Sequence, residues 1–154
     1  MNSAGRSAIP LPKAVVLLLD DNDDSRVAHA RDLRDAGFDV TEVADSRSAL
    51  DVAPNVRPHV IIVRFDPGSR DDRLNVCQQL KADRRTQTVP VLLLSETNAE
   101  EDLRLTTEAG ALALTVIPPD RTKLIAAVHG VLAVKQSEQL RASLQRPGDV
   151  PRSA

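Results

Sequence analysis

The chain is almost free of aromatic side chains. Its 154 residues contain no Trp, no Tyr and only Phe38 and Phe65. A sheet that stacks nucleic-acid bases on aromatic rings is therefore not expected, and neither is an aromatic cage for a quaternary ammonium ligand. The single cysteine, Cys77, excludes an internal disulfide and a metal site made of several cysteines.

A strong net charge and long apolar runs are missing as well. The 20 basic and 22 acidic residues leave a formal net charge of −2, so no overall field attracts nucleic acid or an anionic membrane. The apolar run Ala14–Leu19 is too short for the core of a signal peptide or for a membrane span. We therefore expect a cytoplasmic protein that contacts neither nucleic acid nor membrane directly.

The signature motifs of common enzymes are also absent. The sequence contains no GxxxxGKS/T, GxGxxG, HExxH or GxSxG, the patterns typical of nucleotide-binding proteins, zinc proteases and hydrolases. We expect a protein that is not an enzyme and carries no cofactor.

Short apolar runs alternate with helical patterns along the chain. The predicted strands are 13–19, 38–44, 60–63, 91–94 and 111–117, and the predicted helices are 24–36, 46–53, 74–82, 98–109 and 120–140. Five successive strand–helix units predict an α/β fold with a doubly wound, five-stranded parallel sheet. We expect a flexible leader at 1–12, one domain at 13–140 and a disordered tail at 141–154.

Several boundaries follow from local signals. Asp24 or Ser25 is placed to cap the first helix, and Pro54 predicts that the second helix ends at Ala53. The segment 66–72 is a predicted polar loop, and RDDR at 70–73 is predicted to be solvated. The three histidines show no metal-ligand spacing, and we expect them to be structural or solvated.

Ligands of such sheets bind beyond the carboxyl ends of the strands, where the winding reverses. Asp20 and Asp21 follow the first predicted strand, and adjacent carboxylates offer the oxygen ligands that Mg²⁺ prefers. A plainer interpretation is that such acids stabilise the start of the next helix. We favour this plainer role for Asp23 and Asp24.

Five segments carry a resemblance to a known family. They read VLLLDDNDDSR, PHVIIVRFDPG, LNVCQQLKAD, VPVLLLSE and AGALALTVIPPD, in this order. Together they resemble the bacterial response-regulator receiver domain of two-component, or phosphorelay, signalling over about residues 13–134. The resemblance implies a flavodoxin-like fold, (βα)5, with strand order 2-1-3-4-5. It also implies an acidic pair for Mg²⁺, an aspartate that a histidine kinase phosphorylates, a switch hydroxyl, and a lysine followed by a cis proline.

Some positions match this pattern. Asp20 and Asp21 fall on the acidic pair, which would be the metal ligands if Mg²⁺ is retained. Ser95 falls on the switch hydroxyl, although a serine there is also an ordinary turn residue. Pro118 falls on the cis-proline position, although a plain strand stop explains it equally well.

Other positions depart from it. Arg64 stands where the phosphoacceptor aspartate belongs, Ile117 where the lysine belongs, and Leu114 where a signalling aromatic is expected. An arginine has no carboxylate and stays cationic, so it cannot form an acyl phosphate. These losses predict a degenerate receiver, or pseudo-receiver.

The substitution at position 64 suggests a physical hypothesis. The guanidinium of Arg64 would bond one or both carboxylates of Asp20 and Asp21, neutralise the pocket and occupy the space of the metal, so that Mg²⁺ binds weakly or not at all. The alternative is that Arg64 extends into solvent. Asp66 is an alternative acceptor, because in an extended chain it points to the same side as Arg64.

We therefore expect a stand-alone receiver-like signalling protein that acts by phosphorylation-independent protein–protein interaction. A histidine kinase or an output protein is the expected partner, and residues 98–140 are the expected contact surface, with a homodimer as another use of it. The alternatives are a true phosphorylated receiver using Asp66 and, from another class, a flavodoxin-like binder of a small ligand. A DNA-binding role is not favoured, because no basic recognition helix is visible.

Overall fold

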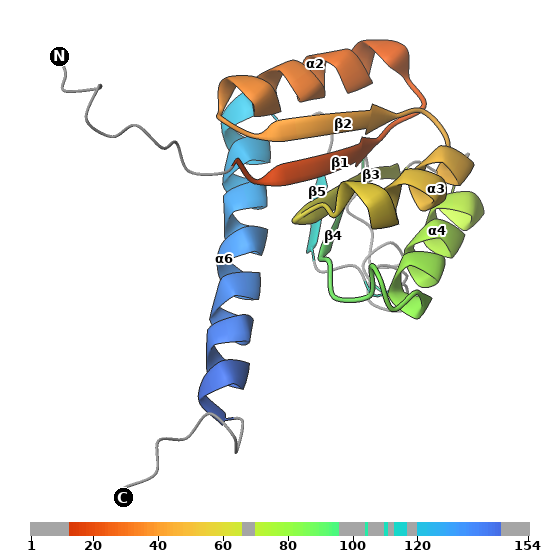
Figure 1. The fold of residues 1–154 in the computed structure, drawn as a ribbon. Helices are drawn as coiled ribbons and strands as arrows, with labels where there is room; N and C mark the ends of the chain where they lie inside the picture. The colour runs from red at the N-terminus through yellow and green to blue at the C-terminus, as the bar shows by residue number, and fades with distance from the viewer. Residues whose placement is uncertain are drawn as a thin grey trace, which may run out of the picture.

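The structure is a computed structural model that describes residues 13–65, 70–95, 104, 110, 113–116 and 120–145. Its strands are β1 (Val15–Leu19), β2 (Asp39–Val43), β3 (Val60–Phe65), β4 (Val91–Ser95) and β5 (Ala113–Val116). Its helices are α2 (Asp23–Asp35), α3 (Ser46–Val56), α4 (Arg70–Ala82) and α6 (Arg121–Gln145), as labelled in Figure 1.

All strand pairs of the sheet are parallel, and the order is β2-β1-β3-β4-β5. The chain therefore leaves β1, turns toward one edge through β2, and then crosses back to β3. The predicted α/β flavodoxin-like fold and the order 2-1-3-4 of its strands are confirmed. The winding reverses between β1 and β3, which places the carboxyl ends of these two strands side by side.

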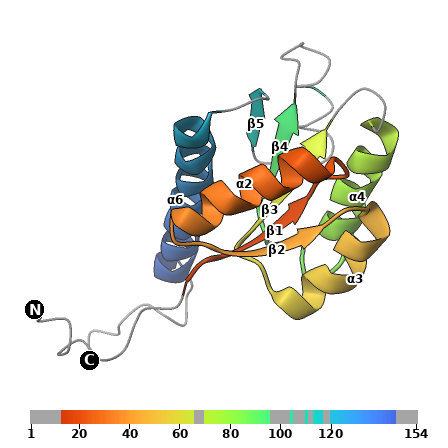
Figure 2. The same ribbon diagram turned by 90° about the horizontal axis from the view of Figure 1, so that it is seen from above.

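Each face of the sheet is covered by helices and has its own apolar core. Figure 2 shows α2 and α6 on one side of the sheet and α3 and α4 on the other. In β1, Val16 and Leu18 belong to the core under α2 and α6, whereas Leu17 and Leu19 belong to the core under α3 and α4. This burial on both faces explains why β1 is an unbroken apolar run instead of an alternating one.

Two helix boundaries differ from those expected. The cap of α2 is Asn22, not Asp24 or Ser25, because the Asn22 side chain accepts a hydrogen bond from the backbone N–H of Ser25 at 2.9 Å. Helix α3 does not end before Pro54 but continues to Val56. The backbone N–H of Arg57 still reaches the carbonyl of Ala53 at 3.1 Å, so the last turn closes despite the proline.

The third and last helices are longer than predicted. Helix α4 begins at Arg70, so the polar segment 70–73 is its first turn and not a solvated loop. Helix α6 continues to Gln145, past the limit of 140 expected for the ordered domain. The predicted helix 98–109 lies outside the described residues except for residue 104.

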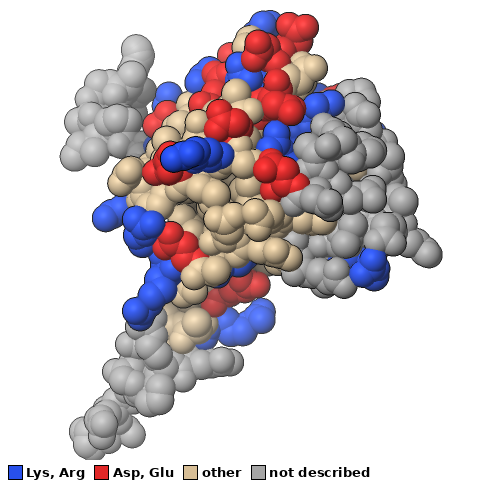
Figure 3. All heavy atoms as spheres, turned by 90° about the vertical axis from the view of Figure 1, so that its right-hand side faces the viewer, with Lys and Arg blue, Asp and Glu red and all other residues tan. Residues whose placement is uncertain are grey.

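Charged side chains of both signs mix on the surface. On the face shown in Figure 3, basic and acidic side chains are interspersed and no extended area of one sign forms, in keeping with the net charge of −2. None of the helices in the described part of the chain is long and apolar enough to cross a membrane.

The two halves of α6 should contribute differently to stability. Leu124 is 1% exposed and lies in the core, whereas Leu140 is 63% exposed. We expect Leu124→Ala to lower the free energy of unfolding by about 3 kcal/mol, because it leaves a cavity in the core. Leu140→Ala should change it little. Urea unfolding of the dilute protein measures both, and equal losses would contradict this division of the helix.

Candidate functional site

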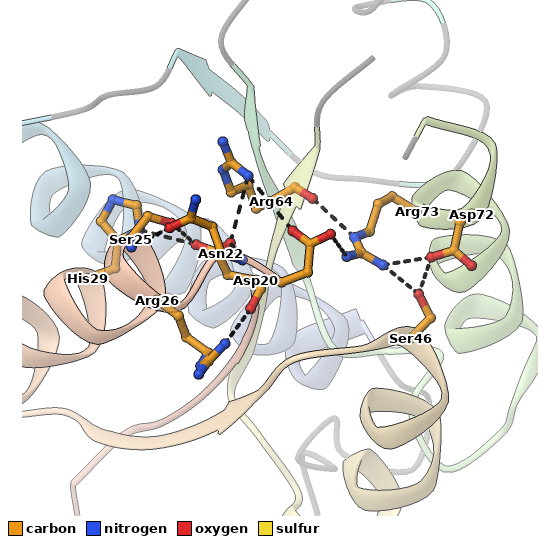
Figure 4. Close-up of polar contacts among 10 residues, drawn as sticks. Asp20, Asn22, Ser25, Arg26, His29, Ser46, Arg64, Asp72 and Arg73 are labelled. Atoms are coloured by element: carbon orange, nitrogen blue, oxygen red, sulfur yellow. Dashed lines mark hydrogen bonds and ion pairs between the residues drawn. The ribbon is translucent and has the colours of Figure 1, made fainter. Parts of the chain in front are cut away.

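The acidic pair begins the loop between β1 and α2, at the carboxyl edge of the sheet. Asp20 is fully buried, whereas the side chain of Asp21 is half exposed. The carboxylate of Asp20 accepts hydrogen bonds from the backbone N–H of Asn22 at 2.9 Å and from the Ser25 hydroxyl. The guanidinium of Arg26 donates to the Asp20 carbonyl at 3.0 Å. The start of α2 therefore holds Asp20 in place (Figure 4).

Arg64 lies beside this pair. Because Leu19 of β1 is in register with Val63 of β3, the residues that follow them come together. Nη1 of Arg64 is 3.9 Å from Oδ1 of Asp20 and 3.8 Å from Oδ1 of Asp21. These distances are too long for hydrogen bonds but are ion-pair distances, so one guanidinium faces both carboxylates.

A second arginine, Arg73 of α4, approaches Asp21 from the side of α4. Its side chain is only 4% exposed, and its Nη2 lies 3.4 Å from Oδ2 of Asp21. Its Nη1 contacts Oδ2 of Asp72 at 2.6 Å and donates to the Ser46 hydroxyl at 2.7 Å. Its Nε donates to the carbonyl of Arg64 at 3.3 Å. Arg73 thus links the ends of β1 and β3 to the starts of α3 and α4 (Figure 4).

Arg73 is not among the residues that the sequence predicts for the site, because the RDDR segment at 70–73 is predicted to be solvated. A signal was present. Arg73 precedes Val76, Cys77 and Leu80 by three, four and seven residues, the spacing of one face of a helix. These three residues are buried. Arg73 therefore lies on the buried face of α4, at the end of the helix that is nearest to the acidic pair.

His29 of α2 is a third group near the buried carboxylate. It is largely buried, and its Nδ1 lies 4.0 Å from Oδ2 of Asp20 without a hydrogen-bond partner. Burial lowers the pKa of His29, Asp20 partly opposes this, and Arg64 adds to the lowering. The neutral form of His29 is therefore favoured, and the positive charge at the site comes from the arginines.

Of the remaining predicted site residues, the structure describes Ser95 and leaves the others outside its described ranges. Ser95 is buried at the end of β4 and is in register with Phe65 of β3, so it lies at the same edge of the sheet. Asp66, Ile117 and Pro118 lie outside the described residues. The alternative acceptor, the lost lysine and the cis proline therefore stay predictions, as does the loss of the signalling aromatic at position 114, whose side chain is also outside the described part.

The other two histidines have structural contacts. Nδ1 of His59 accepts a hydrogen bond from the backbone N–H of Val15 at 2.9 Å. The ring of His129 lies 5.3 Å from that of Phe38, between centroids. These contacts agree with the structural role expected for both.

The carboxylates present do not fit a magnesium ion. Both oxygens of Asp20 already accept hydrogen bonds, and each oxygen of Asp21 faces a guanidinium. Mg²⁺ is bound through one or two carboxylates and keeps several waters in an octahedral arrangement, so it needs open space beside the pair. The guanidinium groups of Arg64 and Arg73 lie there instead. Over the described ranges, no three His, Cys, Asp or Glu side chains gather into a group that could hold a metal ion.

A parallel doubly wound sheet with an acidic pair at its switch point defines an α/β fold of the flavodoxin-like class, and comparison with known proteins identifies the family. The sequence profile of the response regulator receiver domain matches residues 16–129. The chain belongs to this family, whose members act in two-component signalling.

Individual relatives agree with this assignment. The chain is 32% identical to the transcriptional regulatory protein PrrA of Mycobacterium leprae over 117 residues, which cover 76% of this chain and 49% of that protein. The chemotaxis protein CheY4 of Vibrio cholerae is 26% identical, with a TM-score of 0.72 over 78% of this chain and 99% of that one. The chain spans about half the length of the curated relatives it matches.

A third protein shares the fold alone. The receiver domain of the sensor histidine kinase PA1611 of Pseudomonas aeruginosa is 21% identical, with a TM-score of 0.68 over 79% of this chain and 99% of that one. That structure holds a magnesium ion coordinated in its active site cleft.

Removal of Arg73 should loosen the site. We expect Arg73→Ala to lower the free energy of unfolding by about 2 kcal/mol, because buried charge-assisted hydrogen bonds are lost while the half-exposed partners stay hydrated. Arg85→Ala is the matched control, since Arg85 pairs with Asp83 at the surface and its loss should change stability little. Urea unfolding compares the two. A loss for Arg73→Ala no larger than that of the control would contradict a central role for Arg73.

Proposed function

We propose that this receiver domain is a protein-interaction module that works without phosphorylation at position 64 and without bound Mg²⁺. The observation that carries the proposal is the position of Arg64, whose Nη1 faces both carboxylates of the acidic pair at 3.8 and 3.9 Å. In this five-stranded receiver, Arg64 stands where the resemblance places the phosphoacceptor.

The charges around the pair support this proposal. Asp20 and Asp21 contribute two negative charges, and Arg64 and Arg73 bring two positive charges within 4 Å of them. A divalent cation entering this pocket would have to displace a guanidinium or remain close to one. Both steps cost free energy, and neither adds an oxygen ligand.

The chemistry of Arg64 points the same way. A phosphoryl group transferred from a histidine kinase needs a carboxylate to receive it, and a guanidinium offers none. In this proposal the domain catalyses no reaction of its own. The arginines keep the charge of the pocket constant, and the domain signals by binding a partner, such as a histidine kinase or an output protein. The surface at about 98–140 remains the proposed contact region.

Magnesium binding tests the pocket. We expect isothermal titration of the protein with MgCl2 to show no binding at micromolar concentrations, because the arginines neutralise the carboxylates. Arg64→Asp should raise the affinity only modestly, since Arg73 still contacts Asp21. Arg64→Asp combined with Arg73→Ala should raise it further. Binding of Mg²⁺ to the unaltered protein with a micromolar dissociation constant would contradict the proposal.

Phosphorylation is tested separately. Incubation with acetyl phosphate, followed by intact-mass measurement, should leave the mass of the protein unchanged, because the acceptor position carries an arginine. An Asp66→Ala variant treated in parallel is the control for the alternative acceptor. An added phosphate that disappears in Asp66→Ala would show a phosphorylated receiver using Asp66 and replace our proposal.

A further inference from the structure

A groove lies at the amino edge of the sheet, the edge opposite to the acidic pair. Ala14, Pro58 and Pro90, which directly precede β1, β3 and β4, line this groove together with side chains of α6. Its volume is about 430 Å³. Figure 1 shows α6 running past the start of β1, so the groove lies between this helix and the edge of the sheet.

The groove is long and narrow. The lining residues of α6 are Leu132, Lys135, Gln136 and Gln139, which share one face of the helix. From the first to the last of them the helix rises about 10 Å. The starts of β1, β3 and β4, which are neighbours in the sheet, also span about 10 Å. These dimensions suit a short extended segment of polypeptide.

The lining combines an apolar floor with a rim of hydrogen-bond donors. The floor consists of Ala14, Pro58, Val89, Pro90 and Leu132. The rim consists of His59, Thr88, Lys135, Gln136 and Gln139, whose side chains can all donate. Nδ1 of His59 accepts a hydrogen bond from Val15, which leaves the donor of the neutral ring at Nε2. No Asp or Glu of the described residues lines the groove. It therefore suits an apolar, uncharged segment that is rich in acceptors.

Such a segment directly precedes the groove in the sequence. Ile9, Pro10, Leu11 and Pro12 are apolar and end two residues before Ala14. They belong to the leader 1–12, which lies outside the described residues. Because proline has no backbone N–H, the four residues offer four carbonyl acceptors and only two N–H donors. Their prolines also favour an extended conformation, so binding costs less conformational entropy.

The length and direction of the segment fit the groove. At about 3.1 Å per residue, the four residues 9–12 span about 12 Å when extended. They start beside Ala14 at β1, one end of the row β1-β3-β4, so they can follow the groove only toward β4. The second half of α6 lies there too, since Lys81 donates to the carbonyl of Val89 at 2.7 Å and the charge of Lys135 acts on Lys81.

We propose that the segment Ile9–Pro12 binds in this groove of its own chain and fastens the second half of α6 to the amino edge of the sheet. The predicted flexible leader is then confined to residues 1–8. Attachment to β1 gives the segment a high effective concentration at the groove, so a modest affinity is sufficient. The inference uses no residue of the acidic pocket, so its failure would leave the proposed function untouched.

The segment after α6 matches the groove less well. Residues 146–154 include Arg146, Asp149 and Arg152, and a charged group loses hydration on an apolar floor. This segment also follows Gln145, beyond the last lining residue of the helix. It would have to turn back along α6 to reach the groove, whereas the leader enters it directly.

Disulfide trapping in the full chain tests the binding. Ala8→Cys combined with Gln139→Cys should form an internal disulfide at least tenfold faster than Ala8→Cys combined with Ser137→Cys. Ser137 is the matched control, because it is exposed like Gln139 but lies on roughly the opposite side of α6. Cys77 gives little background, since it is buried and burial raises its pKa to about 11.

Two outcomes of this trapping would overturn the proposal. Equal rates for the two cysteine pairs would show a leader that samples all sides of the helix. Disulfide-linked dimers whose fraction rises with protein concentration would show that the leader binds a second copy and not its own chain.

Polar substitutions in the leader test whether its apolar side chains hold it in the groove. Ile9→Asn together with Leu11→Asn, added to the Ala8→Cys and Gln139→Cys protein, should slow disulfide formation to the rate of the Ser137→Cys control. Ala4→Asn, a polar change outside the segment, should leave the fast rate unchanged. A fast rate that survives both substitutions, or that Ala4→Asn abolishes equally, would contradict binding by Ile9 and Leu11.

Discussion

The contacts of Arg64 with Asp20 and Asp21, and of Arg73 with Asp21, set the balance of charge at the carboxyl edge of this sheet. Arg64 reaches the pair because β1 and β3 are adjacent and in register. Arg73 reaches Asp21 because it is a buried residue of the first turn of α4. In the proposed function the two guanidinium groups stand in the place of a metal ion. The fold is that of a receiver domain, and in the function proposed here the charge of its site stays constant.

The sequence predicted the fold well, because its signals are local and strong. The unbroken apolar strands indicate a sheet buried on both faces, and helical spacing between them indicates crossover helices. The errors fall where tertiary contacts override local preference. Pro54 was predicted to end α3, yet the packing of Ala49 and Ala53 against the sheet and α4 holds the last turn. The predicted cap of α2 was wrong because several neighbouring residues, Asn22 among them, have side chains that can cap a helix equally well.

The site was predictable in part. The register of a parallel sheet places Arg64 beside Asp20 and Asp21, so sequence position alone indicated that contact. Arg73 was missed because its partners come from four different segments: the loop after β1, the end of β3 and the starts of α3 and α4. An arginine in a polar stretch looks solvated until the helix that carries it is placed against the sheet. A contact among distant segments is a property of packing and not of local pattern.

Asp21 contacts two arginines, Arg64 and Arg73. These two contacts affect what a single substitution in this pocket can change. A single substitution that restored an aspartate at position 64 would leave Arg73 on Asp21 and on the carbonyl of residue 64. The intermediate sequence would have neither the charge balance of the present pocket nor a free metal site. Under the proposed function, a carboxylate at position 64 would therefore need a second change, at Arg73, before the acidic pair is free of guanidinium contacts.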